Sequence, residues 1–416
     1  MQGKKYNFDE IINRKGSGAL KIDALKERYG RDDLIGMWVA DMDFRCGDFI
    51  TDALKRRCDH GIFGYSITPE GFRNSIIRWT KSRHQWELQK EWISYIPGIV
   101  KGIALCIMHF TKPNEKVIIQ TPVYHPFRIV TKMHGRTVVN NPLIEEKGLY
   151  RMDLEGLKSL IDNDKDVKLL ILCNPHNPVG ITWDAATLRE LTHICSDRGV
   201  LVISDEIHAD MALFGHHHLP FATVSHEAEH NSITFMAPSK TFNIAGIVSS
   251  YAIIPNPDLR SSFYRFLAAS ELDEGTIFAY TATEAAYIHG EAWLLQMLTY
   301  LEDNIRFVDT YLKEYIPEIH AVIPQASFLV WLDCRRLQLS QRDLVALFVD
   351  GAGLALNDGE IFGMEGRGFM RLNVGCPRAV LQKALEQLNN AVTSLDSLET
   401  PKKVSCNAGK DFRNLD

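Results

Sequence analysis

The sequence predicts an α/β fold: a large domain, with a mostly parallel sheet covered by helices, is joined to a smaller α+β domain. Through the middle of the chain, short apolar runs that end at Gly, Pro, Asn or Asp alternate with amphipathic helical stretches. Strands that are apolar along their whole length are typical of parallel sheets, which are covered on both faces. The length of 416 residues also exceeds one ordinary domain.

The central elements follow one another as expected strands and helices. Four apolar runs predict strands, and they cover residues 117–120, 167–173, 200–204 and 232–236. Between the second and third of these strands, Leu188, Leu191 and Ile194 recur at the spacing of one helix face. This spacing predicts a helix over residues 185–198, which gives the strand–helix–strand order of a parallel sheet.

The two ends of the chain predict a different architecture. Residues 1–50 are polar, whereas a helical pattern from about Glu291 leads to a pair of strands within 321–332 and a helix over 341–349. The tail is poor in apolar residues and is expected to be loosely attached. We therefore expect a large domain, a small domain built from both ends and a C-terminal tail, at residues 51–289, 1–50 with 290–396, and 397–416.

The composition excludes several classes of protein. Hydrophobic residues make up 45% and charged residues 24% of the chain, as in globular proteins. The net charge of −6 comes without a long basic run, which argues against nucleic-acid binding. No apolar run reaches the roughly 18 residues of a membrane span, and the polar start predicts no secretion signal. The eight scattered Cys, without a C-x-x-C pair, indicate a reduced, cytoplasmic protein.

The first candidate site follows the strand over 167–173. The run NPHNPVG, residues 174–180, contains two Asn-Pro steps, and a residue before proline avoids the helical conformation. An isolated Asn-Pro step is usually a plain loop. Two such steps and a glycine, at the carboxyl end of a strand where open α/β sheets bind ligands, favour a functional site that includes Asn177.

Two further candidates follow the next two strands. The run DEIH, residues 205–208, begins with a carboxylate that needs a hydrogen-bonding or cationic partner if it is buried, although Asp205 could equally be a helix N-cap. The run SKTFN, residues 239–243, places Lys240 after an apolar strand. A buried lysine there loses its charge readily and becomes a nucleophile for carbonyl groups. A lone lysine in such a loop is otherwise usually exposed.

Together the candidates carry a family resemblance. The order Asn177, Asp205, Lys240, with Arg371 late in the chain, resembles the fold-type I pyridoxal 5′-phosphate (PLP) enzymes of the class I/II aminotransferase family. The resemblance covers nearly the whole chain and implies the aspartate-aminotransferase-like fold. Within the family, three segments are similar to the cystathionine β-lyase-like C–S lyase branch: WVADMDF, DEIH and APSKTFN, residues 38–44, 205–208 and 237–243.

The resemblance implies how PLP would be held. Lys240 matches the lysine that binds PLP covalently and moves protons at the substrate Cα, and Asp205 matches the carboxylate that faces the pyridine nitrogen. Asn177 matches the amide beside the phenolic oxygen of the ring, and His208 stands next to it. Aspartate-aminotransferase-like enzymes usually carry Tyr at the position of His208. Tyr124 matches the aromatic side chain that stacks on the ring.

The resemblance also places the cofactor phosphate and the substrate. The phosphate is expected at a helix N-terminus opened by Gly98, with the amides of Val100 and Lys101 and the hydroxyl of Ser239 as donors. The family often adds an Arg where Val248 stands here. On the substrate side, Arg371 matches the arginine that binds the α-carboxylate, and the backbone N–H of Ala40 assists it. Tyr65 matches a tyrosine that reaches the cofactor phosphate of the other subunit in a homodimer.

The function implied is a PLP-dependent C–S β-lyase that cleaves cystathionine or related cysteine thioethers to pyruvate, ammonia and a thiol. The alternative is an aminotransferase, and a third hypothesis, from another class, is a PLP-loaded protein that binds a regulatory partner. Loss of Lys240 or Arg371 would favour the third, and both are present. No metal is expected, because the adjacent histidines 216–218 cannot all face one ion. The motif GSG, residues 16–18, lacks the third glycine of a dinucleotide site.

Overall fold

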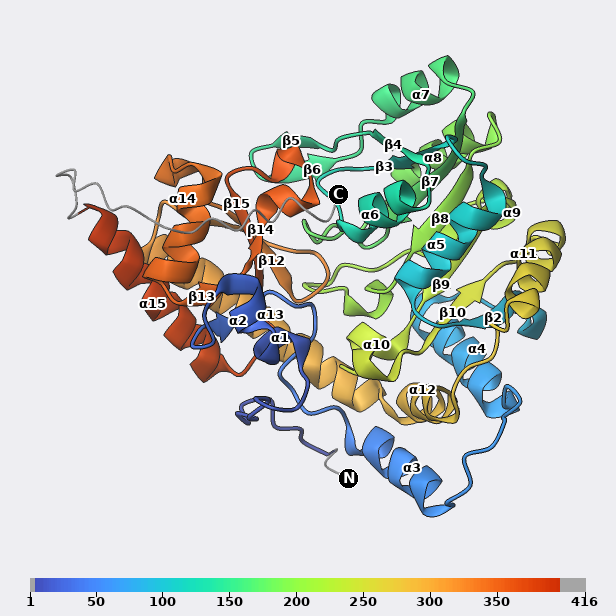
Figure 1. Cartoon of the computed structure of the whole chain (residues 1–416), viewed down its shortest axis with the longest axis horizontal. Helices are drawn as coiled ribbons and strands as arrows, with labels where there is room; N and C mark the ends of the chain where they lie inside the picture. The colour runs from blue at the N-terminus through green and yellow to red at the C-terminus, as the bar shows by residue number, and fades with distance from the viewer. Residues whose placement is uncertain (1–3, 397–416) are drawn as a thin grey trace.

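A computed structural model describes residues 4–396, and its central element is a seven-stranded sheet (Figure 1). The strand order is β2-β10-β9-β8-β7-β3-β4, in which β10 alone runs antiparallel to its neighbours. The prediction of a mostly parallel sheet is therefore confirmed. The strands of this sheet are β2 (Ile93–Ile96), β3 (Lys116–Ile119), β4 (Thr137–Asn140), β7 (Val167–Cys173), β8 (Leu201–Asp205), β9 (Ser232–Met236) and β10 (Ser250–Ile253).

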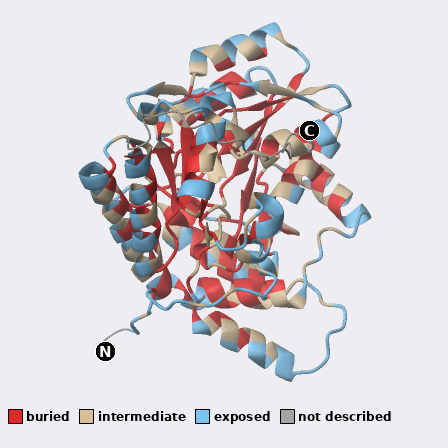
Figure 2. Cartoon of the chain, turned by 60° about the vertical axis from the view of Figure 1, so that its left-hand side comes forward, coloured by how far each residue is buried: buried red, intermediate tan, exposed pale blue. Residues whose placement is uncertain are grey.

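Helices cover both faces of this sheet, and the alternation of side chains along β7 shows how. Leu169 and Ile171 belong to a core shared with the helices α5, α6 and α11, whereas Leu170 and Leu172 belong to a core shared with α7 and α8. β7 is thus apolar on both sides, and Figure 2 shows the central strands of the sheet buried between helices with exposed outer faces. These helices are α5 (Ile99–Phe110), α6 (Pro126–Met133), α7 (Leu154–Asn163), α8 (Ala185–Ser196) and α11 (Pro257–Ala269).

A second, antiparallel sheet has the strand order β11-β12-β15-β14. Near it, β1 (Ile35–Gly36) pairs in parallel with β13 (Leu354–Ala355), so the start of the chain lies against its last quarter (Figure 1). This contact supports our proposal that 1–50 and 290–396 form one small domain beside 51–289. The elements here are β11 (His320–Val322), β12 (Leu329–Asp333), β14 (Asn357–Asp358), β15 (Phe369–Asn373), α1 (Leu20–Asp23), α2 (Leu25–Tyr29), α13 (Glu291–Tyr315), α14 (Gln341–Ala346) and α15 (Arg378–Asp396).

The expected elements differ from the observed ones mainly at their ends. The strand expected over 200–204 is shifted by one residue to Leu201–Asp205, which makes Asp205 the last residue of β8. The helix expected over 341–349 is α14 followed by a π-helical turn, Leu347–Gly351. The expected tail, 397–416, lies outside the described residues. The remaining elements are α3 (Asp48–Asp59), α4 (Glu70–His84), β5 (Ile144–Glu146), β6 (Leu149–Arg151), α9 (His226–His230), α10 (Pro238–Thr241) and α12 (Ile277–His289).

Candidate active site

Four candidate side chains lie at the carboxyl ends of neighbouring parallel strands. Tyr124 follows β3, Asn177 follows β7, Asp205 ends β8, and Lys240 lies in the short helix α10 directly after β9. Since β3, β7, β8 and β9 are adjacent and parallel, these residues share one edge of the sheet, where α/β folds bind their ligands. The grouping expected from the order of the motifs is therefore present in the fold.

Lys240 has an amine that is held by one hydrogen bond. Its Nζ donates a hydrogen bond to the carbonyl oxygen of Ala40 at 2.6 Å, and it forms no ion pair with any residue in 4–396. Burial lowers the pKa of Lys240 to about 8; the charge of Asp41 opposes this shift, and that of Arg371 adds to it. An amine with this pKa loses its proton close to neutral pH, which a nucleophile and proton carrier requires.

Asp205 is a buried carboxylate that lacks a countercharge in contact. Its Oδ1 accepts a hydrogen bond from the backbone N–H of Ile207 at 3.1 Å, and no cation of residues 4–396 lies within ion-pair distance. Burial raises the pKa of Asp205 to about 7, although the Ile207 N–H and Lys240 both oppose the shift. A carboxylate in this state favours a positively charged partner in direct contact, which residues 4–396 do not supply.

Arg371 is a buried guanidinium held by neutral oxygens. Nη1 donates to Oδ1 of Asn177 at 2.9 Å, and Nη2 donates to the Trp38 carbonyl at 3.0 Å and to Oδ1 of Asn357 at 2.5 Å. Its Nε has no partner among residues 4–396, and no carboxylate of the described chain pairs with it. Burial lowers the pKa of Arg371 to about 10, so it stays charged at neutral pH and suits a small carboxylate ligand.

His208 and Tyr124 lie close to the charged groups of Lys240, Asp205 and Arg371. His208 is buried, and its Nδ1 has no hydrogen-bond partner within residues 4–396. Burial lowers the pKa of His208 to about 3, with the charges of Lys240 and Arg371 adding to the shift, so the ring is neutral. Tyr124 is half-buried, and burial also raises its pKa. The nearby charges of Asp205 and Arg371 act on its hydroxyl, which places Tyr124 in the same group.

The N-terminus of α5 offers backbone donors to an anion. Gly98, at its N-cap with a φ of 110°, has no side chain that could cap the helix. The first helical hydrogen bond is made by the N–H of Gly102, which leaves the N–H groups of Val100 and Lys101 in the uncapped first turn. Ser239, the residue before Lys240, is buried. The donors that the sequence analysis named are therefore present, on α5 and α10.

Two candidate residues lie apart from the strand ends. The backbone of Ala40 reaches the group through the hydrogen bond from Lys240, so its segment joins the site. Tyr65 is fully exposed and touches none of the other candidates in the single chain. Its neighbours are also exposed and apolar: Ile62, Phe63 and Ile67. One chain therefore links seven candidates through contacts or charges: Ala40, Tyr124, Asn177, Asp205, His208, Lys240 and Arg371.

Comparison with known proteins decides the family. The model of the family "Aminotransferase class I and II" matches residues 39–388. This chain belongs to that family. It is 41% identical to cystathionine beta-lyase PatB of Bacillus subtilis, over 93% of this chain and 100% of that protein. The structure of cystalysin from Treponema denticola, which contains PLP, has a TM-score of 0.91 at 34% identity, over 94% of this chain and 100% of that one.

A third similar protein carries the alternative name. A PLP-bound structure from Clostridium difficile 630, described as an aminotransferase, has a TM-score of 0.91 at 42% identity, over 93% of this chain and 100% of its own. The resemblance that the motifs predicted, to fold-type I PLP enzymes of the C–S lyase branch, is confirmed by these relatives. Since solved structures at this similarity hold PLP, the family's cofactor is PLP.

The residues present in this family member fit PLP. Asp205 is a buried carboxylate without a countercharge, which a protonated ring nitrogen would supply. Lys240 offers an amine of lowered pKa for an aldehyde, and the uncapped turn of α5 offers N–H donors for a phosphate. The unpartnered Nδ1 of His208 provides a further polar contact. The aldehyde, the ring nitrogen and the phosphate of PLP therefore each have a complementary group at this edge of the sheet.

Sequence reasoning missed two residues that shape the site of this aminotransferase-family protein. Asn357, on β14, lies opposite Arg371 on β15 in the antiparallel pairing, and its Oδ1 accepts a hydrogen bond from Nη2 of Arg371. Asp210 is buried and accepts hydrogen bonds from Thr241, next to Lys240, at 3.0 Å, and from Trp79 and His84. Burial opposes the charge of Asp210, yet its contacts with His84 hold its pKa below the usual value. Neither residue stands in a motif, although DEIHAD could have drawn attention to Asp210.

Proposed function

We propose that this protein is a PLP-dependent C–S β-lyase that cleaves cystathionine or a related cysteine thioether to pyruvate, ammonia and a thiol. The observation that carries the proposal is the 41% identity to cystathionine beta-lyase PatB over 100% of that protein. The site agrees with it, because a buried amine and a buried carboxylate lie at one sheet edge, and Arg371, which has no ion pair among residues 4–396, is hydrogen-bonded to Asn177 beside them. An aminotransferase is the second candidate, favoured by the name of the C. difficile structure.

Lys240 is proposed to act as the proton carrier. When bound, PLP withdraws electrons from the substrate Cα and so makes its C–H bond acidic. The neutral Nζ of Lys240 takes this proton, which its lowered pKa allows near neutral pH. The electron pair left at Cα forms a Cα=Cβ double bond as the Cβ–S bond breaks with its own pair on sulfur, and the released thiolate takes up a proton to give the thiol. Addition of water to the remaining three-carbon fragment gives pyruvate and ammonia.

The other side chains hold the substrate and the cofactor in place. Arg371 binds the substrate α-carboxylate through its fork, and the N–H of Ala40 assists it. With PLP bound, Asp205 would keep a proton on the ring nitrogen, and Asn177 and His208 would offer polar contacts to the phenolic oxygen. The remaining proposed cofactor contacts would be made by Tyr124 to the ring and by Val100, Lys101 and Ser239 to the phosphate.

Products distinguish a lyase from an aminotransferase. A lyase needs a leaving group on Cβ and no amino acceptor, whereas an aminotransferase stops after one half-reaction without a keto acid. We expect the purified enzyme, given cystathionine and no keto acid, to form homocysteine, pyruvate and ammonia in equal amounts over many turnovers. The measurement is product quantification over time at a fixed enzyme concentration.

The opposite result has an equally clear form. One conversion per active site to the pyridoxamine form, with turnover resuming only after 2-oxoglutarate or pyruvate is added, would replace the lyase by the aminotransferase. Alanine, which has no leaving group on Cβ, serves as the control substrate. A lyase forms no pyruvate from alanine in the absence of a keto acid.

We also propose a cytoplasmic homodimer with shared active sites. The support is the exposed apolar segment around Tyr65, since such a patch on one chain marks an interaction surface. Phe63 of this segment contacts Phe278, which also lines an open hollow of about 420 Å³ between α3 and α12. In the proposed dimer, the Tyr65 hydroxyl reaches the cofactor phosphate of the other subunit. No helix within residues 4–396 has the length and apolar character that crossing a membrane requires.

Mixed dimers test whether Tyr65 reaches the active site of the other subunit. Tyr65→Phe removes one charge-assisted hydrogen bond and should weaken PLP binding by roughly 10- to 100-fold. A heterodimer of a Lys240→Ala chain and a Tyr65→Phe chain has one site with Lys240 of one subunit and the intact Tyr65 of the other. We expect that site to bind PLP with wild-type affinity and to give about half the wild-type activity per dimer. Verified heterodimers that bind PLP as weakly as Tyr65→Phe itself would contradict the shared site.

A further inference from the structure

The segment over residues 38–44 is fixed to the active site by its own backbone. Five consecutive carbonyl oxygens, from Trp38 to Met42, each accept a hydrogen bond from a side chain. The donors come from distant parts of the chain, and in order they are Arg371 (3.0 Å), Asn373 (2.6 Å), Lys240 (2.6 Å), Asn373 again (2.7 Å) and Asn243 (2.8 Å). The carbonyl of Ala40, which receives the amine of Lys240, is thus one of a row of fixed acceptors.

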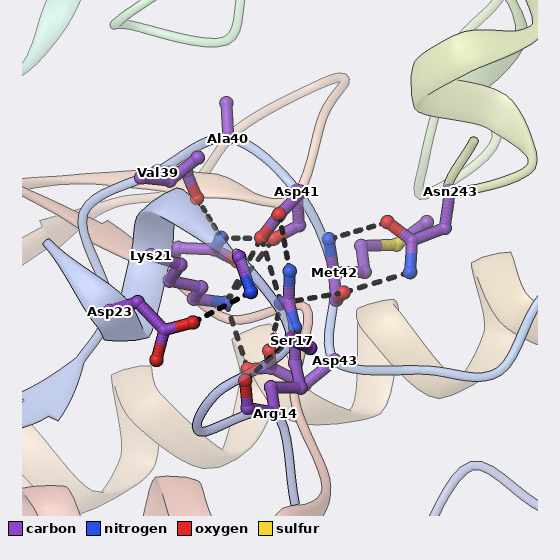
Figure 3. A network of polar contacts seen from close by, with 12 residues as sticks. Arg14, Ser17, Lys21, Asp23, Val39, Ala40, Asp41, Met42, Asp43 and Asn243 are labelled. Carbon is purple, nitrogen blue, oxygen red and sulfur yellow. Dashed lines mark hydrogen bonds and ion pairs between the residues drawn. The ribbon is translucent and has the colours of Figure 1, made fainter. Parts of the chain in front are cut away.

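A cluster of four charges lies beneath this row (Figure 3). We call it the four-charge cluster, and its members are Arg14, Lys21, Asp41 and Asp43. Arg14 contacts both carboxylates, at 2.7 Å to Oδ2 of Asp41 and 2.6 Å to Oδ1 of Asp43. Lys21 lies 2.8 Å from Oδ2 of Asp43 and also donates to the backbone carbonyl of Asp41 at 3.2 Å. Two cations face two carboxylates, so the cluster is neutral as a whole.

The cluster is more than a surface ion pair. The side chain of Lys21 is 1% exposed, and those of Arg14, Asp41 and Asp43 are about 20% exposed. Its charges are therefore screened less than those of exposed pairs. Asp41 follows Ala40 directly, and its carboxylate acts on the amine of Lys240 from close by. The cluster is thus linked to the reactive amine in two ways, through the segment that carries the Ala40 carbonyl and through the charge of Asp41.

We propose that the four-charge cluster positions Lys240: it holds the Ala40 carbonyl against the amine, and its balance of charges sets how easily that amine loses its proton. Arg14, Lys21, Asp41 and Asp43 are positioning residues, because they act on the reaction only through Lys240. The inference rests on the proposed function for the role of Lys240. Titration of the Lys240 amine tests this role without measuring turnover. The positioning role can therefore fail while the lyase assignment stands, and the lyase assignment can fail while the positioning role stands.

The sign of each effect follows from the groups around Lys240. The charged and titratable groups that face its amine are Asp41 from the segment 38–44, Asp205 from β8, His208 after β8, and Arg371 from β15. Loss of Arg14 leaves the cluster with one net negative charge, which stabilises the protonated amine. Replacement of Asp41 by Asn leaves one net positive charge, which stabilises the neutral amine. The two variants should therefore move the titration of Lys240 in opposite directions.

The experiment is trace acetylation of the full-length chain freed of PLP, read at Lys240 by mass spectrometry as a function of pH. Only the neutral amine reacts, so the midpoint of the curve reports the titration of Lys240. We expect Arg14→Gln to raise the midpoint and Asp41→Asn to lower it, each by roughly half a pH unit to one pH unit. Arg14→Lys keeps the charge and should restore a midpoint close to that of the wild type.

A matched control is available in the turn that follows β12. Arg335 also bridges two carboxylates, at 2.7 Å to Asp333 and 3.1 Å to Glu145, without facing Lys240. Arg335→Gln should leave the midpoint unchanged. A purely structural role would move both cluster variants the same way or not at all, and either result would overturn the proposal. If circular dichroism shows that Asp41→Asn does not fold, the comparison of Arg14→Gln with Arg14→Lys decides. A midpoint that is raised in Arg14→Gln and close to the wild-type value in Arg14→Lys supports the proposal. Equal midpoints in the two variants refute it.

Discussion

Lys240→Ala is expected to abolish turnover with cystathionine, with a loss of at least about 10³-fold. Proton transfer by a placed side chain alone contributes about 10²- to 10⁴-fold, and Lys240 is also the proposed point of covalent attachment of PLP. The structure supports this because the amine has no ion pair among residues 4–396, donates to the Ala40 carbonyl and has its pKa lowered by burial. Lys240→Arg should be equally inactive, since a guanidinium keeps the charge but does not form the bond.

Spectroscopy separates this prediction from a loss of folding. The wild-type protein should be yellow, and borohydride should bleach its band and fix PLP on the peptide that contains Lys240. Lys240→Ala should show no such covalent adduct while keeping the wild-type circular dichroism. Lys132→Ala, an exposed lysine on α6, is the control and should retain colour and activity. A reduced adduct on any lysine other than Lys240 would overturn the assignment.

The sequence was sufficient to predict which strand ends carry the candidate residues. Asn177, Asp205 and Lys240 each directly follow or end an apolar run, and apolar runs separated by helices form neighbouring parallel strands. Periodicity located β7 and β9 to the residue. The predicted bounds of β8 were wrong by one residue, because an apolar run does not show whether the backbone of the following Asp205 still pairs with the neighbouring strand.

Contacts between distant segments were beyond such reasoning. Asn357 supports Arg371 only because the antiparallel register of β14 and β15 places the two residues opposite each other. The four-charge cluster joins residues 14 and 21 to the segment that meets Lys240, and no local pattern encodes that approach. Tyr65 shows a third limit, since its proposed partner lies on another chain. A sequence specifies strand order and local motifs more directly than it specifies which loops meet across the fold.

Asp205→Asn is the second change with a large expected effect. A buried ion pair broken on one side costs about 3–5 kcal/mol, and Asp205 is proposed to pair with the protonated ring nitrogen of PLP. If this loss falls wholly on removal of the Cα proton, turnover should decrease by roughly 10²- to 10³-fold or more. Steady-state assays at saturating PLP and cystathionine measure it. Near-wild-type turnover in the folded variant would refute the role of Asp205.

The same substitution should stabilise the chain when PLP is absent, and this second result tests whether Asp205 is kept for function. Burial raises the pKa of Asp205 to about 7 in the folded chain, above the usual value near 3.8. A raised carboxyl pKa means that the folded state binds the proton more tightly, so its contribution to stability is present at low pH and is lost as the pH rises toward 7. Asn carries no charge and avoids this loss.

Chemical unfolding of the PLP-free chains measures the effect. At pH 8, Asp205→Asn should be more stable than the wild type by a few kcal/mol, the free energy that corresponds to the rise in the Asp205 pKa. At pH 4 the two chains should be about equally stable. A variant that is less stable than the wild type at pH 8 would mean that Asp205 holds the fold together and is not an uncompensated charge awaiting the cofactor.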